Sequence, residues 1–229
     1  MSNSVGAVIV AAGKGSRMGT AESKQFLLLR DKPVIVHTLE VFQRHERIQE
    51  IVLVTGTGDR ERCLEWIGQY SLTKVTAVVA GGAERQYSVH EGLKRLNTEW
   101  VMVHDGVRPF VQASEITACC EQAERTGASV LAVPVKDTIK QVDGQGMVVS
   151  TPDRRSLWAI QTPQTFRLSE LLAAYEAAAR EGFLGTDDSM LAERAGIAVA
   201  VVEGSYANIK LTTPEDLEFA EFRSRSERR

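Results

Sequence analysis

Short apolar runs rich in β-branched residues alternate with longer amphipathic stretches in the part of the chain before Pro134. The runs are apolar at nearly every position, which is typical of strands that helices cover on both faces of a parallel sheet. This alternation predicts an α/β fold with a doubly wound, mostly parallel sheet. The expected strands are Val5–Val10, Ile51–Val54, Thr76–Ala80, Trp100–His104 and Ala128–Val133. The expected helices are Pro33–His45, Asp59–Tyr70, Glu84–Leu96 and Ser114–Thr126.

The alternation is interrupted after Pro134. Thr138–Val142 and Met147–Ser150 flank a turn-forming Asp-Gly-Gln-Gly segment, which predicts a β-hairpin. An isolated hairpin is marginally stable in water, so we expect this one to pack on another surface; a second subunit would make the protein a homodimer. The remaining expected elements are helices at Leu168–Gly182 and Asp187–Ala195, strands at Ala198–Glu203 and Asn208–Leu211, and a last helix that begins at Pro214 after the N-cap Thr213.

The size, charge and cysteine content of the chain limit the kinds of protein it can be. Its 229 residues suit one large α/β domain and are few for two. The net charge of -3 comes from interleaved acids and bases, so no basic stripe offers a surface for nucleic acid. Cys63, Cys119 and Cys120 lack the spacing of a zinc site or a disulfide framework, which favours a reducing, cytoplasmic location. The apolar run Val5–Ala12 is too short to span a membrane.

A glycine-rich segment, Ala11–Met18, directly follows the first expected strand. Ligands of doubly wound sheets bind beyond the carboxyl ends of the strands, and Gly13 and Gly15 let backbone N–H groups approach an anion there. The P-loop pattern is absent, and the dinucleotide fingerprint fails because a methionine occupies its third glycine position. Arg17 and Lys24 could neutralise the charge that builds on a triphosphate as pyrophosphate leaves. The alternative is an ordinary turn followed by two solvated cations.

Two further segments follow expected strands at the same edge of the sheet. In Gly81–Val89, the N–H groups of a helix start and the Ser88 hydroxyl could contact a base or ribose, although ordinary helix capping explains them equally well. In His104–Pro109, Asp105 is the best candidate ligand for Mg²⁺, which such sites hold with one or two carboxylates, substrate phosphate oxygens and water. Arg108 could bind a substrate phosphate; a plain salt bridge within the loop is the alternative. The histidine that opens this segment is expected to be structural.

Together these segments resemble the 2-C-methyl-D-erythritol 4-phosphate cytidylyltransferase family of the isoprenoid pathway. The resemblance extends over nearly the whole chain and is far more specific than any single motif. The matching motifs are A-A-G-x-G-x-R-M at Ala11–Met18 with Lys24-Gln25, G-G-x-E-R-x-x-S-V at Gly81–Val89, H-D-x-x-R-P at His104–Pro109, P-V-x-D-T at Pro134–Thr138, D-R-x-x-L-W at Asp153–Trp158, T-P-Q at Thr162–Gln164, T-D at Thr186-Asp187 and N-I-K-x-T-x-P-E-D-L at Asn208–Leu217. Two positions depart from the family pattern, Ser23 where proline is common and Gly106 where alanine is common, and both could loosen the local backbone.

The resemblance implies a Rossmann-like nucleotidyltransferase domain over residues 1–229, with a β-arm insertion at about 136–158 that embraces a partner subunit. It implies Mg²⁺-dependent transfer of CMP from CTP to 2-C-methyl-D-erythritol 4-phosphate, with release of pyrophosphate. The implied CTP-binding residues are Ala11, Ala12, Gly13, Gly15, Gly82, Arg85, Ser88 and Gly106. The implied catalytic residues are Arg17 and Lys24, which would stabilise the transition state, Asp105 at the metal, and Arg154 and Lys210, which would orient the acceptor. The implied acceptor-binding residues are Arg108, Thr138, Arg154, Thr162, Thr186 and Lys210, of which Thr138 and Arg154 could complete a neighbour's site.

Two other functions compete with this one. The first is the same chemistry on another acceptor, such as ribitol 5-phosphate, because related cytidylyltransferases share these loops. The second is a regulatory protein that binds a nucleotide without turnover. That function would predict loss of the charged groups, yet Arg17, Lys24 and Asp105 are all present.

Overall fold

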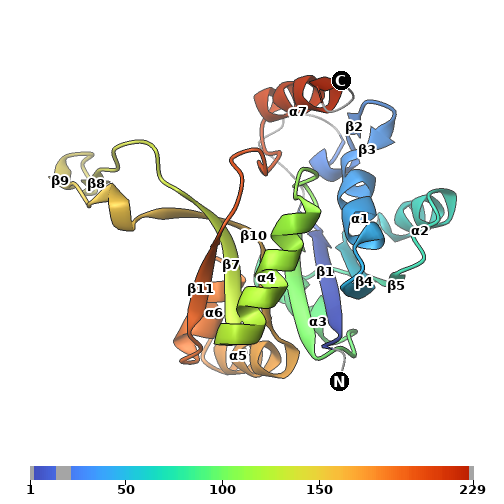
Figure 1. The fold of residues 1–229 in the computed structure, drawn as a ribbon, viewed down its shortest axis with the longest axis horizontal. Helices are drawn as coiled ribbons and strands as arrows, with labels where there is room; N and C mark the ends of the chain where they lie inside the picture. Colours follow the sequence, from blue (N-terminus) through green and yellow to red (C-terminus); the bar gives the residue numbers. More distant parts are fainter. Residues whose placement is uncertain (1–2, 14–21, 227–229) are drawn as a thin grey trace.

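The computed structural model describes residues 3–13 and 22–226. Its main feature is a seven-stranded sheet in the order β11-β7-β10-β6-β1-β4-β5 (Figure 1). All neighbouring strands in it are parallel except β10, which runs antiparallel to β6 and β7. The strands are β1 (Val5–Ala11), β4 (Ile48–Thr55), β5 (Val75–Ala80), β6 (Trp100–Asp105), β7 (Ala128–Pro134), β10 (Trp158–Arg167) and β11 (Val199–Glu203).

Helices cover both faces of this sheet. One face packs against α1 (Val34–Arg44), α2 (Arg60–Gln69) and α4 (Ala113–Thr126). The other face packs against α3 (Arg85–Leu93), α5 (Leu168–Arg180) and α6 (Asp188–Arg194). Successive side chains of a strand point to opposite faces, so in β1 Ala7 and Ile9 join the first core and Val8 joins the second. The predicted doubly wound, mostly parallel α/β fold is therefore confirmed.

One predicted strand is absent from the structure, and the long strand β10 was not predicted. The sequence analysis assigned no strand to β10, because Pro163 and several polar residues interrupt its pattern. A register shift between Ile160 and Gln164 accommodates the proline, and the buried Gln164 side chain donates to Asp187. Conversely, the strand expected at Asn208–Leu211 is wrong: this segment has no strand structure and is held by single hydrogen bonds, such as that from Leu211 N–H to the Val107 carbonyl.

The predicted hairpin is present, although its strands are shorter than expected. It consists of β8 (Gln141–Val142) and β9 (Val148–Ser150), followed by a short 3₁₀ helix at Arg154–Ser156. Figure 1 shows this arm projecting away from the main sheet. Every residue from 136 to 151 is exposed, including three consecutive apolar side chains at positions 147–149. The apolar side chains of the arm therefore face outward.

A third layer lies above the sheet's upper edge in Figure 1. It contains the 3₁₀ helix η2 (Lys24–Phe26), the short strands β2 (Leu28–Leu29) and β3 (Lys32–Pro33), and α7 (Pro214–Ser226). A small apolar cluster joins this layer to the loop after β6. As predicted, α7 begins at Pro214.

The strand order creates a switch point beside β1. The chain passes from β1 to β4 and β5 on one side, and then returns to place β6 on the other side of β1. The strand ends are in register, since Val10 pairs with Asp105, Ala11 with Thr55, and Thr55 with Ala80. Crevices at such switch points are the usual ligand sites of open α/β sheets.

Candidate active site

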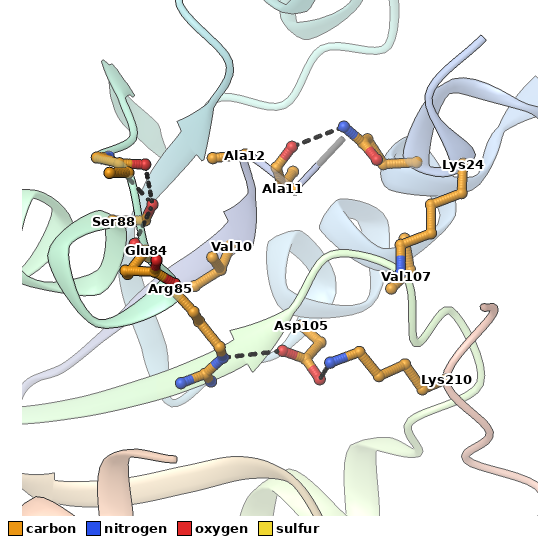
Figure 2. A pocket seen from close by; sticks show the side chains of 14 residues that line it. Val10, Ala11, Ala12, Lys24, Glu84, Arg85, Ser88, Asp105, Val107 and Lys210 are labelled. Carbon is orange, nitrogen blue, oxygen red and sulfur yellow. Dashed lines mark hydrogen bonds and ion pairs between the residues drawn. The ribbon is translucent and has the colours of Figure 1, made fainter. Parts of the chain in front are cut away.

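A pocket of about 230 Å³ opens at this switch point (Figure 2). Three separate loops form its walls: the end of β1, the loop from β5 into α3, and the loop after β6. Lys24 from η2 and Lys210 from the segment after β11 complete it. The structure thus brings together residues from all three segments that the sequence singled out.

The first wall is the end of β1, where Ala11, Ala12 and Gly13 line the pocket. Gly15 and Arg17 lie outside the described residues. Lys24 lines the same pocket, and Figure 2 shows its side chain extending from η2 toward Val107. The end of β1 is linked to η2 by Gln25, whose buried Nε2 donates to the Ala11 carbonyl at 2.8 Å.

Gln25 is adjacent to Lys24 in a sequence motif that does not by itself indicate a role for it. Its side chain is only 2% exposed, and a buried amide must find a hydrogen-bond partner. Here that partner is the Ala11 carbonyl at the end of β1, so Gln25 links η2, the element that carries Lys24, to this strand. The adjacency of lysine and glutamine was the available signal, but the sequence could not show the contact with β1.

The second wall is the loop that leads into α3. Gly82 N–H donates to the Ser88 Oγ at 3.1 Å, and Ser88 Oγ donates to the Glu84 carbonyl at 3.0 Å. Gly81 must be small, because a Cβ there would lie 2.4 Å from the Ala12 Cβ and 2.7 Å from Ser88 Oγ. The loop after β1 and the loop into α3 therefore contact each other at Gly81. Ser88 lines the pocket and also holds the loop into α3 through its hydrogen bonds.

The third wall carries Asp105, which is 6% exposed. Its Oδ2 lies 2.9 Å from Lys210 Nζ and 3.3 Å from Arg108 Nε, and its Oδ1 lies 3.5 Å from Arg85 Nε. Burial alone would raise the pKa of this carboxyl, but the charges of Arg85, Lys210 and Arg108 hold its pKa well below the usual range. Asp105 is therefore an anion at any physiological pH, surrounded by three cations.

Arg85 joins this cluster to α6. Its two terminal nitrogens donate to Asp188 at 3.0 and 2.8 Å, and the Tyr175 hydroxyl donates to the same carboxylate. Burial alone would lower the pKa of Arg85, but the charges of Asp188 and Asp105 raise it above its ordinary value. Asp188 and Tyr175 could not be identified from the sequence, because neither residue lies near Arg85 in the chain.

Behind Asp105, a buried hydrogen-bond network holds the loop. The ring of His104 faces the Arg108 carbonyl with Nε2 at 3.2 Å and the Thr162 hydroxyl with Nδ1 at 3.0 Å. Burial lowers the pKa of His104 to about 4, so the ring is neutral, donates from Nε2 to the carbonyl and accepts from Thr162 at Nδ1. Thr162 Oγ1 also accepts from the Asp105 N–H at 3.0 Å. The His104 contacts agree with its expected structural role, and the Thr162 hydroxyl proton is already engaged.

Arg108 and Gly106 are also more enclosed than their expected ligand roles suggest. Arg108 donates through Nη1 to the Asn208 carbonyl at 2.7 Å, and it is 9% exposed. Gly106 does not line the pocket, and a Cβ there would come within 2.6 Å of Ile35 Cδ1. The space that alanine would fill in the family pattern is thus taken up by an isoleucine side chain.

Three expected acceptor-binding residues lie elsewhere in the isolated chain. Thr138 and Arg154 belong to the arm, where Arg154 Nη1 donates to the Lys136 carbonyl at 2.9 Å. Thr186 is exposed before α6 and contacts the sulfur of Met190. None of the three lines the pocket that holds Asp105 and Lys210.

The donor set at Asp105 fits a magnesium ion only with help from a substrate. No cluster of three or more His, Cys, Asp or Glu side chains that could hold a metal occurs within residues 3–13 and 22–226. Asp105 nevertheless offers a buried, ionised carboxylate at the pocket, and Arg85 Nε lies 3.5 Å from its Oδ1. One carboxylate oxygen combined with phosphate oxygens and water is an ordinary environment for Mg²⁺.

The comparisons with known proteins agree on one family. The profile of the 2-C-methyl-D-erythritol 4-phosphate cytidylyltransferases matches residues 5–226. The chain is 54% identical to the 2-C-methyl-D-erythritol 4-phosphate cytidylyltransferase of Bacillus velezensis over 216 residues, which cover 93% of each protein. It is also similar to the crystal structure of the 4-diphosphocytidyl-2C-methyl-D-erythritol synthase of Anaerococcus prevotii, with a TM-score of 0.86 and 32% identity over 98% of this chain and 97% of that one. The Thermus thermophilus structure of a 2-C-methyl-D-erythritol 4-phosphate cytidylyltransferase gives a TM-score of 0.80 and 32% identity over 98% and 100% of the two chains.

Proposed function

The chain belongs to the 2-C-methyl-D-erythritol 4-phosphate cytidylyltransferase family, and on that premise we propose how its pocket carries out the family's reaction. The reaction transfers CMP from CTP to 2-C-methyl-D-erythritol 4-phosphate and yields 4-diphosphocytidyl-2-C-methyl-D-erythritol and pyrophosphate, a step of the non-mevalonate isoprenoid pathway. One observation supports the assignment to this pocket most strongly. Lys24, Arg85 and Lys210 line a single cavity together with Asp105, between two glycine-containing loops.

In the proposed mechanism, a phosphate oxygen of the acceptor attacks the α-phosphorus of CTP. The bond between this phosphorus and the oxygen that bridges to the β-phosphorus breaks, and pyrophosphate leaves on the opposite side. The acceptor phosphate is already an anion, so no general base is required, and the enzyme contributes positioning and charge compensation. Lys24 and Arg17 stabilise the charge on the departing pyrophosphate, whereas Lys210 orients the acceptor.

In this proposal, the two glycine-containing segments, Ala11–Met18 and Gly81–Val89, bind CTP. Gly82 and Ser88 present a fixed backbone, because their mutual hydrogen bond holds the loop before the nucleotide arrives. Asp105 would hold Mg²⁺ when the nucleotide is bound. The ion supplies charge neutralisation on the triphosphate.

We further propose that the chain is one nucleotidyltransferase domain with a β-arm insertion at about 136–158, and that it forms a homodimer through this arm. Val148 is 57% exposed and Met147 is 65% exposed, so the arm presents an apolar surface that a second copy could cover. Pairing would also bring Thr138 and Arg154 near a neighbour's pocket. Sedimentation of the purified protein tests this: Val148→Asp should shift a dimer toward monomer, and a wild-type protein that sediments as a monomer would refute it.

A cytoplasmic location is the last part of the proposal. Its support is that Cys63, Cys119 and Cys120 are buried free thiols, as reducing compartments favour. In the part of the chain that the structure describes, no helix combines the length and the apolar character needed to cross a membrane.

The acceptor is tested by direct comparison. Purified protein is incubated with CTP, Mg²⁺ and either 2-C-methyl-D-erythritol 4-phosphate or ribitol 5-phosphate, and pyrophosphate release is followed. We expect rapid release with the first compound and little with the second. Preference for ribitol 5-phosphate would support the rival acceptor, and binding of CTP without turnover on either compound would support a regulatory protein.

A further inference from the structure

Asp188 holds the guanidinium of Arg85 in one orientation. Arg85 Nη1 donates to Oδ1 of Asp188 at 3.0 Å, and Nη2 donates to Oδ2 at 2.8 Å. Asp188 is 0% exposed, and the Tyr175 hydroxyl donates to its Oδ1. A bidentate pairing with a buried, hydrogen-bonded carboxylate fixes both the position and the plane of the guanidinium.

This orientation decides which part of Arg85 faces Asp105. Figure 2 shows Nε directed at Asp105 and the two terminal nitrogens directed away from it. The contact from Nε to Oδ1 is 3.5 Å, longer than a normal N–H···O hydrogen bond. The close cationic contacts of Asp105 are instead on Oδ2, where Lys210 lies at 2.9 Å and Arg108 at 3.3 Å. Within the described residues, Oδ2 therefore has the two shorter cationic contacts, and the contact of Arg85 with Oδ1 is the longest of the three.

Loss of the Asp188 carboxylate would remove the partner that keeps the two terminal nitrogens of Arg85 away from Asp105. A guanidinium prefers a bidentate carboxylate, and Asp105 is the other carboxylate with which Arg85 has a recorded ionic contact. A rotated Arg85 would place a terminal N–H group on Oδ1. The cation would then occupy the oxygen that the proposed magnesium site requires.

We propose that Asp188, held by Tyr175, is a positioning residue that keeps the two terminal nitrogens of Arg85 away from Oδ1 of Asp105, so that this oxygen, which Arg85 Nε approaches at 3.5 Å, can bind Mg²⁺ with the nucleotide. The inference rests on the proposed magnesium role of Asp105. It assigns a task to two buried residues that do not line the pocket and that sequence reasoning did not identify.

The test is equilibrium binding of CTP to the full-length protein by calorimetry, once in EDTA and once in saturating Mg²⁺. For the wild type, we expect Mg²⁺ to tighten CTP binding, and Asp105→Asn should remove that tightening. In Asp188→Asn, the ratio of the two dissociation constants should fall by about tenfold, because Arg85 competes with the ion. In Tyr175→Phe, which keeps both charges and loses one hydrogen bond, it should fall by about threefold.

Asp187→Asn is the matched control. Asp187 precedes Asp188 and caps α6 by accepting from Met190 N–H at 3.0 Å, a role that asparagine also fills. Its recorded contacts do not include Arg85. This variant should retain the wild-type ratio.

The outcomes separate the inference from its premise. If Asp188→Asn and Tyr175→Phe weaken CTP binding equally with and without Mg²⁺, or not at all, Asp188 is only structural and the inference is wrong. If Asp188→Asn does not fold by circular dichroism, Tyr175→Phe decides alone. If the wild type shows no effect of Mg²⁺ on CTP binding, the proposed magnesium site fails and takes the inference with it.

Discussion

Gly81→Ala gives a quantitative test of how closely the first two loops meet. The new Cβ would lie 2.4 Å from the Ala12 Cβ, and neither partner can yield easily. The Ala12 methyl is attached directly to the loop after β1, and the Gly81 N–H is tied to the Thr55 carbonyl of β4 at 2.8 Å. To reach an ordinary carbon–carbon contact, the two loops must separate by about 1 Å.

The expected consequences follow from that displacement. A misplacement of about 1 Å in a positioned active site can lower turnover about 100-fold, and the overpacking should lower the free energy of unfolding by about 1–3 kcal/mol. Steady-state kinetics for CTP and urea unfolding measure the two effects. The matched control is Gly68→Ala in α2, where a Cβ would meet nothing within 4 Å; it should keep wild-type kinetics. Wild-type turnover in Gly81→Ala would refute the close approach of the loops.

Two further substitutions test other parts of the site. Gln25→Leu removes the buried hydrogen bond to the Ala11 carbonyl. It should lower the free energy of unfolding by about 1–2 kcal/mol, and it should reduce kcat because Lys24 is no longer fixed. A kcat equal to that of the wild type would show that Gln25 does not position Lys24. Asp105→Asn should destabilise the protein at neutral pH, because Arg85, Arg108 and Lys210 lose their shared anion. Since the folded pKa of Asp105 is lowered, its stabilising contribution is present above the unfolded pKa and is lost as pH falls below about 4. Urea unfolding of both proteins between pH 3 and pH 7 should therefore show the difference narrowing toward acid, and a difference independent of pH would contradict the charge assignment.

The sequence was sufficient for the elements whose residues are uniformly apolar. β1 and β6 are buried along their length, so their hydrophobic runs predicted them directly. β10 could not be predicted in this way, because Gln161 and Gln164 are buried polar residues whose partners come from remote segments, at the Ser205 carbonyl and at Asp187. A local pattern carries no information about such partners.

In the site, too, some residues could be predicted from local sequence and others depend on partners that are remote in the chain. Lys24 and Asp105 could be singled out because each follows a strand end in a motif with a charged side chain, and the pocket contains both. Roles for Gln25, Tyr175 and Asp188 could not be assigned in this way, because their partners are distant in the sequence. Arg85 and Asp188 are 103 positions apart, and Gln25 acts on a backbone carbonyl 14 positions away. Only the folded chain reveals which neutral or buried groups hold the charged ones in place.

The central claim is that Lys24 faces the bond that breaks when pyrophosphate leaves. Single-turnover measurement of pyrophosphate release by Lys24→Ala, with CTP affinity measured in parallel, tests it most directly; Lys94→Ala, which removes an exposed lysine paired with Glu91, is the control. The account predicts that release by Lys24→Ala slows about 100-fold or more while the protein still folds and binds CTP. Release at the wild-type rate would contradict the account.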